Sequence, residues 1–185
     1  MRLQRLRPAY SEDELARLYA RPHDHTRWPD HHLRVDATLA VARWMARDGI
    51  GSAADLSCGN GHILRSLDAR RKYFGDYAPG YSITGPIDKT IHEIPTVDLF
   101  VCSETIEHLD DPDMVLIGIR AKARMLVLST PVEAWDDANP EHYWAWDRER
   151  VESMVRAAGW LPHVYTAVDF RPQGLPYCFG IWGLL

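Results

Sequence analysis

Long apolar runs, paired cysteines and an excess of positive charge are all missing from this sequence of 185 residues. Its three cysteines, Cys58, Cys102 and Cys178, lie far apart without metal-binding spacing, which favours a reducing compartment over a disulfide framework. No apolar run approaches the roughly 20 residues that a membrane-spanning helix needs. The basic residues 1–8 precede no apolar segment, so we do not expect a signal peptide. These absences predict a cytoplasmic protein without a membrane partner.

Lysine and arginine together number 21, against 26 aspartates and glutamates, so the formal net charge is -5. This balance argues against a protein that binds nucleic acid mainly through the phosphate backbone, although a local basic patch is compatible with it. The length predicts a single domain, 1–185. Within it we expect residues 1–49 to form a helical cover and residues 50–185 to form the core.

Capping residues and apolar spacing predict two helices near the N-terminus. Ser11 and Glu14 form a capping box for a helix over 11–20. Asp30 is a good cap for a longer helix that ends near residue 47. After this helix the pattern alternates between strand and helix. Strands are predicted at 53–56, 72–76, 97–102, 124–129, 161–169 and 177–184, and helices at 61–70, 111–121 and 147–158.

This alternation predicts an α/β fold with a mostly parallel sheet covered on both faces. The short segment 171–174, which contains proline and glycine, indicates that the last two strands form an antiparallel hairpin at one sheet edge. Only residues 77–82 separate the second strand from the next candidate strand near Ile83, which is too short for a crossover helix. We therefore expect the crossover after the second strand to be trimmed.

A glycine-containing turn, Asp55-Leu56-Ser57-Cys58-Gly59-Asn60-Gly61-His62, follows the first predicted core strand. Gly59 and Gly61 allow a sharp bend and let a ligand approach the backbone closely. The turn has two glycines rather than the three of the dinucleotide fingerprint, so a cofactor without phosphates fits better than NAD. A purely structural turn beside a solvated acidic residue is the competing interpretation.

This segment resembles the first motif of class I S-adenosylmethionine-dependent methyltransferases, which have a Rossmann-like fold. The resemblance implies that the turn holds the methionine end of the cofactor and that Asp76, at the end of the second strand, binds the ribose hydroxyls. A carboxylate suits that role because it accepts two hydrogen bonds from a vicinal diol. The implied cofactor-binding residues are Asp55, Ser57, Cys58, Gly59, Gly61, Asp76, Tyr77 and Ser103, with Ile87 and Asp88 as candidates for the adenine.

The resemblance runs from about residue 50 to residue 169. It includes Cys102-Ser103-Glu104-Thr105-Ile106-Glu107-His108 after the fourth strand, Ser129-Thr130-Pro131 at the end of the fifth and Ala158-Gly159-Trp160 before the sixth. The missing second crossover helix departs from the family pattern. We expect this departure to affect the adenine site.

Acids and histidines gather at the carboxyl end of the predicted sheet, where α/β proteins bind ligands. Glu104, Glu107 and His108 follow the fourth strand, and His142 follows the fifth. The set is similar to that of ubiquinone-pathway O-methyltransferases and of small-RNA 3′-end 2′-O-methyltransferases. In the latter, the resemblance implies a divalent metal such as Mg that orients vicinal hydroxyls and lowers their pKa. Two further interpretations stay open: His108 acts as general base while Glu104 orders the loop, or the set is structural.

Two further clusters have less specific patterns. His23, His25, His31 and His32 match no zinc signature, so they indicate either a metal site or a polar loop. Trp28 and His32 are candidates for lining the pocket. An aromatic run after the fifth strand predicts either an acceptor-pocket wall or a packed lid; it comprises Trp135, Tyr143, Trp144 and Trp146.

The sequence as a whole predicts an S-adenosylmethionine-dependent methyltransferase that methylates an oxygen of a small molecule. An RNA 2′-O-methyltransferase is less favoured because of the acidic net charge. A methyltransferase-like module that binds without catalysis and a nucleotide-dependent oxidoreductase are two competing functions for the same fold. The residues do not identify the methyl acceptor.

Overall fold

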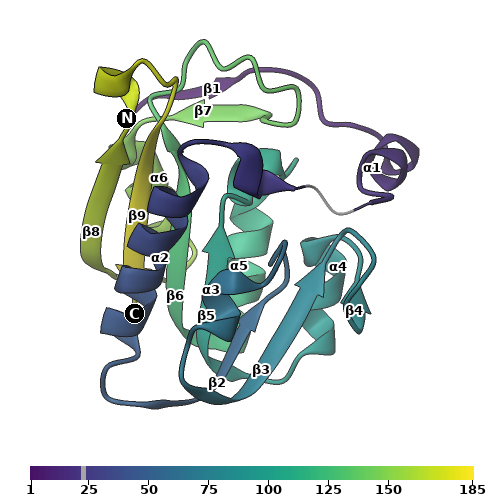
Figure 1. Ribbon diagram of the computed structural model, residues 1–185, viewed down its shortest axis with the longest axis vertical. Coiled ribbons are helices and arrows are strands. Elements are labelled where there is room, and N and C mark those ends of the chain that lie inside the picture. The colour runs from purple at the N-terminus through teal and green to yellow at the C-terminus, as the bar shows by residue number, and fades with distance from the viewer. Residues whose placement is uncertain (22–23) are drawn as a thin grey trace.

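The computed structural model describes residues 1–21 and 24–185, and for His25 only the backbone (Figure 1). Seven strands form one sheet in the order β4-β3-β2-β5-β6-β9-β8. Their bounds are β2 Ile50–Asp55, β3 Ala69–Asp76, β4 Ile83–Thr84, β5 Val97–Ser103, β6 Ala123–Val132, β8 Pro162–Asp169 and β9 Cys178–Leu184. Strands β4, β3, β2, β5 and β6 pair in parallel, whereas β9 is antiparallel to both β6 and β8. The predicted parallel sheet with an antiparallel hairpin at its edge is therefore confirmed.

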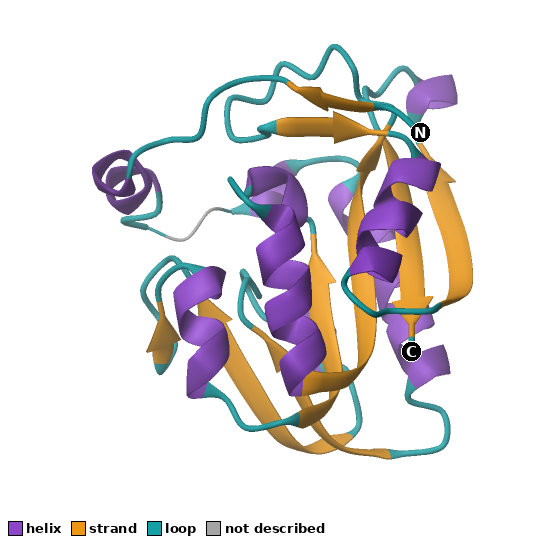
Figure 2. Ribbon diagram, turned by 180° about the vertical axis from the view of Figure 1, so that it is seen from behind, coloured by secondary structure: helices purple, strands orange, loops and turns teal. Residues whose placement is uncertain are grey.

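Helices cover both faces of this sheet. In Figure 1, α2 and α3 lie in front of it, and Figure 2 shows α4, α5 and α6 on the opposite face. Their bounds are α2 His31–Met45, α3 His62–Arg65, α4 Ile87–Thr90, α5 Pro112–Lys122 and α6 Arg148–Ala157. Strand β5 shows why two layers form, because Leu99 and Val101 belong to the hydrophobic core under α2, while Phe100 and Cys102 belong to the core under α5.

Side-chain caps explain where three of the helices begin. Ser11 and Glu14 form the predicted capping box of α1, which spans Glu12–Leu18. Asp111 and Asp147 each accept a hydrogen bond from the first turn of α5 and α6. The prediction for Asp30 was wrong: it precedes α2 in helical conformation, and its side chain makes no capping hydrogen bond.

The predicted and observed boundaries of the elements differ most just before β3, the second predicted core strand. The helix predicted over 61–70 was wrong, because α3 ends at Arg65 and β3 already begins at Ala69. The trimmed crossover is confirmed, since β4 pairs in parallel with β3 with no helix between them. Pairing of Ala69 with Ile50 thus overrides the helical propensity of Ala69.

A second, two-stranded sheet lies across the carboxyl end of the large one and was not predicted (Figure 1). It pairs β1 (Leu3–Arg5) with β7 (Trp144–Trp146) in antiparallel register. After β1 the chain runs to α1. An ion pair between Glu12 of α1 and Lys89 of α4 joins these two helices. The short 3-10 helices are η1 His25–Arg27, η2 Ile91–Glu93, η3 Ile106–His108 and η4 Arg171–Gln173. Within the described residues, no helix is long and apolar enough to cross a bilayer.

Two glycines provide a matched test of the packing around β3. An added Cβ at Gly75 would lie 2.8 Å from Leu56 Cδ2, whereas at Gly118 in α5 the nearest atom would be Ile91 Cγ2 at 3.6 Å. We predict that Gly75→Ala lowers the free energy of unfolding by about 1–3 kcal/mol through overpacking. Gly118→Ala should leave it unchanged or raise it by up to about 1 kcal/mol, because alanine favours helix. Urea titration measures both; equal stability of the two variants would contradict this packing.

Candidate active site

The glycine turn connects the end of β2 to α3 at the carboxyl edge of the sheet. Gly59 and Gly61 have φ values of 53° and 72°, in the left-handed region that favours glycine. The turn is joined to β3 because the amide of Cys58 donates to the carbonyl of Gly75 at 3.0 Å. A Cβ at Gly61 would also lie 3.1 Å from the ring of Phe74. Both the conformation and the neighbouring strand therefore require glycine at residue 61.

The carboxylate of Asp76 faces this turn. Its Oδ2 accepts a hydrogen bond from the amide of Gly59 at 2.7 Å, and its Oδ1 accepts one from the amide of Ala78 at 2.9 Å. The acidic residue at the end of β3 and the glycine bend after β2 are thus in direct contact. A carboxylate has about four acceptor positions, so two remain for a ligand.

Aromatic rings lie around the turn. The hydroxyl of Tyr81 donates to the carbonyl of Gly59 at 2.9 Å, and its ring stacks on Phe74 with a centroid separation of 5.8 Å. On the other side, Tyr77 packs against Tyr19, which follows α1, at 5.2 Å. The N-terminal segment therefore reaches the residue after Asp76.

Asp55, the last residue of β2, is a buried carboxyl group. One of its oxygens accepts a hydrogen bond from the amide of Ser57 at 3.1 Å. Burial raises its pKa to about 7, and the negative charge of Asp76 adds to this rise. The hydroxyl of Ser57 lies 2.6 Å from that of Thr105, so the loops after β2 and β5 are linked.

Glu104 follows β5 with a φ of 50°, an uncommon backbone conformation for a residue other than glycine. Its carboxylate accepts a hydrogen bond from Ser129 Oγ at 2.7 Å. Ser129 Oγ in turn lies 2.8 Å from Ser103 Oγ. Arg34 Nη1 in α2 lies 4.0 Å from Glu104 Oε1. Burial raises the pKa of Glu104, and the nearby Arg34 opposes that rise. Strained backbone of this kind is typical of functional sites.

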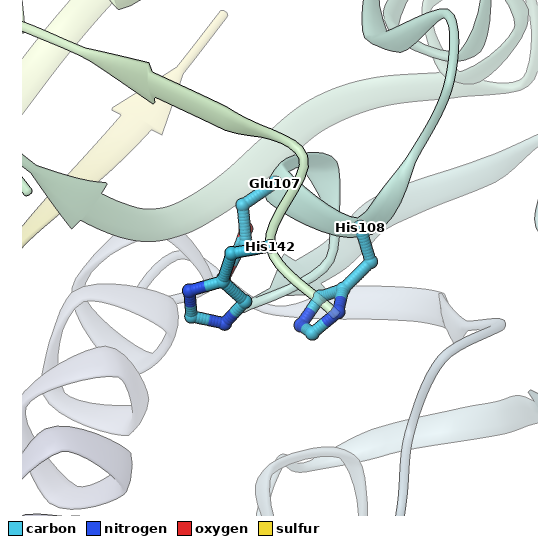
Figure 3. A group of neighbouring side chains, drawn as sticks. All are labelled: Glu107, His108 and His142. Carbon is cyan, nitrogen blue, oxygen red and sulfur yellow. The ribbon is translucent and has the colours of Figure 1, made fainter. Parts of the chain in front are cut away.

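Glu107, His108 and His142 come together at the carboxyl end of the sheet (Figure 3). One nitrogen or oxygen from each of the three lies within 4.8 Å of the others, a separation that suits ligands of one metal ion. The rings of His108 and His142 have centroids 4.7 Å apart. Glu104 was predicted with these three but does not belong to the group in the part of the chain that the structure describes.

Glu107 is 1% exposed, and its two carboxylate oxygens differ in their hydrogen bonding. Oε2 accepts a hydrogen bond from Thr130 Oγ1 at 3.0 Å, whereas Oε1 is buried without a hydrogen bond from any described residue. Burial and the adjacent Glu104 raise the pKa of Glu107 well above its usual range. A buried oxygen without a donor is costly, and a bound cation would compensate that cost.

Sequence reasoning missed the residues that surround His142. Asp137 Oδ2 lies 2.6 Å from its Nδ1, and Asn139 Nδ2 lies 3.1 Å from its Nε2. Although burial opposes it, the hydrogen bond with His142 lowers the pKa of Asp137. The turn-forming residues Asp137 and Asn139 were a local signal for this loop. No local pattern indicated Arg34 or Tyr177.

The N-terminal histidines and Trp28 do not gather at one site among the described residues. His23 lies outside the described residues, and only the backbone of His25 is described. The rings of His31 and His32 are 5.3 Å apart, and neither joins a three-ligand group among the described residues. Trp28 is an exposed residue that precedes α2. His31, in contrast, is buried beside Arg34.

The aromatic run is mostly a packed lid. Tyr143 and Trp146 are buried, and Trp146 Nε1 donates to the carbonyl of Pro131 at 3.0 Å. Trp144 Nε1 donates to the carbonyl of Leu109 at 2.9 Å, and the guanidinium of Arg2 covers Trp135. A surface cavity of about 390 Å³ beside β7 and α5 is lined in part by Trp144 and Trp146 of this run, but by none of the residues predicted to bind the cofactor or a metal.

No protein-family model matches this chain, and no curated protein matches it in sequence. Solved structures do match its fold. A Burkholderia thailandensis 1,6-didemethyltoxoflavin-N1-methyltransferase, with its substrate and S-adenosylhomocysteine bound, is 14% identical, with a TM-score of 0.71 over 98% of this chain and 93% of that one. The N-methyltransferase NodS from Bradyrhizobium japonicum, in complex with S-adenosylhomocysteine, is 14% identical, with a TM-score of 0.68 over 93% and 96%.

The small RNA methyltransferase HEN1 also matches, at 14% identity and a TM-score of 0.63, over 89% of this chain but only 26% of that larger one. This chain therefore has the fold of class I S-adenosylmethionine-dependent methyltransferases, as its sequence predicted. Identities this low establish the fold alone.

The raised pKa of Asp55 predicts a pH dependence of stability. Between about pH 4 and pH 7 the folded protein retains a proton on this carboxyl that the unfolded chain releases. The contribution of Asp55 to stability therefore falls as the pH rises through this range, by at most roughly 4 kcal/mol. Asp55→Asn keeps an oxygen for the Ser57 amide and should have a smaller decline, measured as urea midpoints at several pH values. Identical pH profiles of the variant and the parent protein would contradict the assignment.

Proposed function

We propose that this chain is a methyltransferase that binds S-adenosylmethionine at the carboxyl ends of β2 and β3. The observation that carries the proposal is the 2.7 Å contact between the Asp76 carboxylate and the Gly59 amide. It brings together the acidic residue and the glycine bend that the family resemblance assigns to the ribose and the methionine end of the cofactor. The solved structures with S-adenosylhomocysteine bound support the same proposal.

Each candidate residue has a role that its surroundings support. The free acceptor positions of Asp76 suit the two ribose hydroxyls. Once ionised, the buried carboxylate of Asp55 would complement the ammonium group of the methionine end. The backbone of the bend lines the path of the cofactor. Tyr77 follows Asp76, Cys58 lies in the turn between β2 and α3, and Ser103 is the last residue of β5.

The reaction is an in-line transfer of the methyl group from the sulfonium to a nucleophilic atom of the acceptor. Little covalent chemistry is needed from the protein, since holding the two reactants in line supplies up to about 7–11 kcal/mol. Glu104 and His108 lie at the sheet edge where the acceptor would enter. Either His108, when it binds no metal, or a bound metal would help to deprotonate the acceptor. Glu104, held by Ser129, would order this loop.

We favour an oxygen of a small molecule as the acceptor. The net charge of -5 argues against a long nucleic acid, and the toxoflavin-type methyltransferase that shares the fold has a small heterocycle bound. RNA is the second candidate, because the small RNA methyltransferase HEN1 shares the fold. The three cysteines are unpaired thiols, which supports a reducing compartment such as the cytoplasm.

The group formed by Glu107, His108 and His142 fits a divalent cation such as Mg²⁺ or Mn²⁺. The fit rests on the buried Glu107 Oε1, which has no hydrogen-bond donor among the described residues, and on two imidazoles within reach of it. A bound cation would orient neighbouring acceptor hydroxyls and lower their pKa. Glu107 would supply the compensating negative charge.

Cofactor binding tests the proposal directly. We predict that S-adenosylhomocysteine binds in calorimetric titration and that NAD does not. Asp76→Asn keeps an oxygen for Gly59 but loses the charge, so affinity for S-adenosylhomocysteine should fall about 10- to 100-fold. Asp68→Asn is the matched control, because Asp68 is exposed at the opposite end of β3. Binding of NAD alone would support an oxidoreductase, and binding of neither compound would support a module without catalysis.

The metal is tested separately by titrating Mn²⁺ into protein that has been treated with EDTA. Glu107→Gln preserves size and removes the charge, so we predict at least about 10-fold weaker Mn²⁺ binding. Glu149→Gln on the exposed surface of α6 serves as the control and should bind like the parent protein. If Glu107→Gln binds Mn²⁺ as tightly as the parent protein, the metal assignment is wrong, whereas the cofactor assignment is unaffected.

A further inference from the structure

His142 lies in a loop between β6 and β7 that is closed by its own polar groups. The amide of Asn139 donates to Asp137 Oδ1 at 2.8 Å, and the amide of Glu141 donates to Asn139 Oδ1 at 3.0 Å. The amide of His142 in turn donates to the carbonyl of Asn139 at 3.2 Å. These bonds define the backbone from which the imidazole projects. The direction of the ring is then decided by contacts at its two nitrogens.

The contact of Asp137 with Nδ1 is shorter than the contact of Asn139 with Nε2. The side chain of Asp137 is 1% exposed, and its Oδ2 lies 2.6 Å from His142 Nδ1. Its other oxygen accepts a hydrogen bond from the hydroxyl of Tyr177 at 2.8 Å. A carboxylate in its ionised form only accepts hydrogen bonds, so Nδ1 must carry the proton. The lone pair of the neutral imidazole is then on Nε2.

We propose that Asp137 is a positioning residue, which holds the His142 imidazole with its proton on Nδ1 and its Nε2 lone pair available beside Glu107 and His108. This inference rests on the proposed cation site and adds the group that prepares one of its ligands. Histidines that bind metals generally donate their second ring nitrogen to a carboxylate, and loss of that partner weakens metal binding. Asp137 touches neither cofactor nor acceptor and acts only through His142.

Asn139 contacts the other ring nitrogen of His142, Nε2. Its Nδ2 lies 3.1 Å from His142 Nε2, the atom that a cation would take. Asn139 therefore competes with a cation for this lone pair, while Asp137 prepares it. Loss of the Asp137 carboxylate and loss of the Asn139 amide donor should have opposite effects on cation affinity, provided that an acceptor for the Glu141 amide remains. If the loop only supports the fold, both changes should weaken cation binding.

The tautomer can be measured without any metal or cofactor. In ¹⁵N-labelled protein after EDTA treatment, long-range ¹H–¹⁵N spectra should show His142 with a protonated Nδ1. Asp137→Ala should produce a mixture of both tautomers. Tyr177→Phe is the matched control, because it removes the donor to Oδ1 and leaves the Oδ2 contact with His142 intact. A His142 tautomer that is unchanged in Asp137→Ala overturns the proposal, provided that circular dichroism shows the variant to be folded.

Mn²⁺ titration of the same proteins supplies the second readout. Asp137→Ala should weaken binding about 10- to 100-fold. Asn139→Ser, which removes the amide donor to Nε2 and keeps a hydroxyl that can accept from the Glu141 amide, should bind at least as tightly as the parent protein. Equal weakening in both folded variants would overturn the proposal in favour of a structural loop. If the parent protein binds no Mn²⁺, the cation site of the proposed function fails. The tautomer spectra then still decide whether Asp137 controls His142.

Discussion

The contact between the Asp76 carboxylate and the Gly59 amide is the constraint on which the rest of the site depends. It requires β3 to run beside β2 in parallel, so that both strands end at the same edge. It also requires the left-handed backbone at Gly59, which directs the amide towards β3. Gly75 allows this close approach, because a side chain there would meet Leu56. The short connection between β3 and β4 also contacts the bend, because the hydroxyl of Tyr81 in this connection donates to the carbonyl of Gly59.

Buried acids set the chemistry of this edge. Asp55, Glu104 and Glu107 all have pKa values raised by burial, and Arg34 is the cation that opposes the rise for the two glutamates. A protein rarely keeps so many carboxyl groups out of water without a ligand to balance them. The positive sulfonium and ammonium groups of the proposed cofactor, together with a divalent cation, would provide that balance. The charge distribution therefore favours cationic ligands both at the cofactor turn beside Asp55 and at the cation site beside Glu107.

The sequence predicted those parts of the fold that depend on local pattern. Strand β5 is apolar without interruption over residues 99–102, and its two faces are both buried there, as a parallel sheet requires. The length of α3 was mispredicted because pairing of β3 from Ala69 onwards depends on β2, which is distant in sequence. Strand β7 was missed for a similar reason, since its partner β1 lies at the other end of the chain. In the site, Glu107 and His108 follow a recognisable strand, whereas Asp137 has meaning only through its contact with His142.

The N-terminal segment connects the two halves of the site. Arg7 donates to the carbonyls of Asp137 and Asn139, so it supports the loop that carries His142. Tyr19, after α1, donates to Glu141 of the same loop at 2.8 Å and packs against Tyr77 beside the proposed ribose carboxylate. Residues 7–19 thus contact both the proposed cation loop and the proposed cofactor turn. Because Tyr19 contacts both Glu141 and Tyr77, cofactor binding and the position of the loop that carries His142 are expected to be coupled.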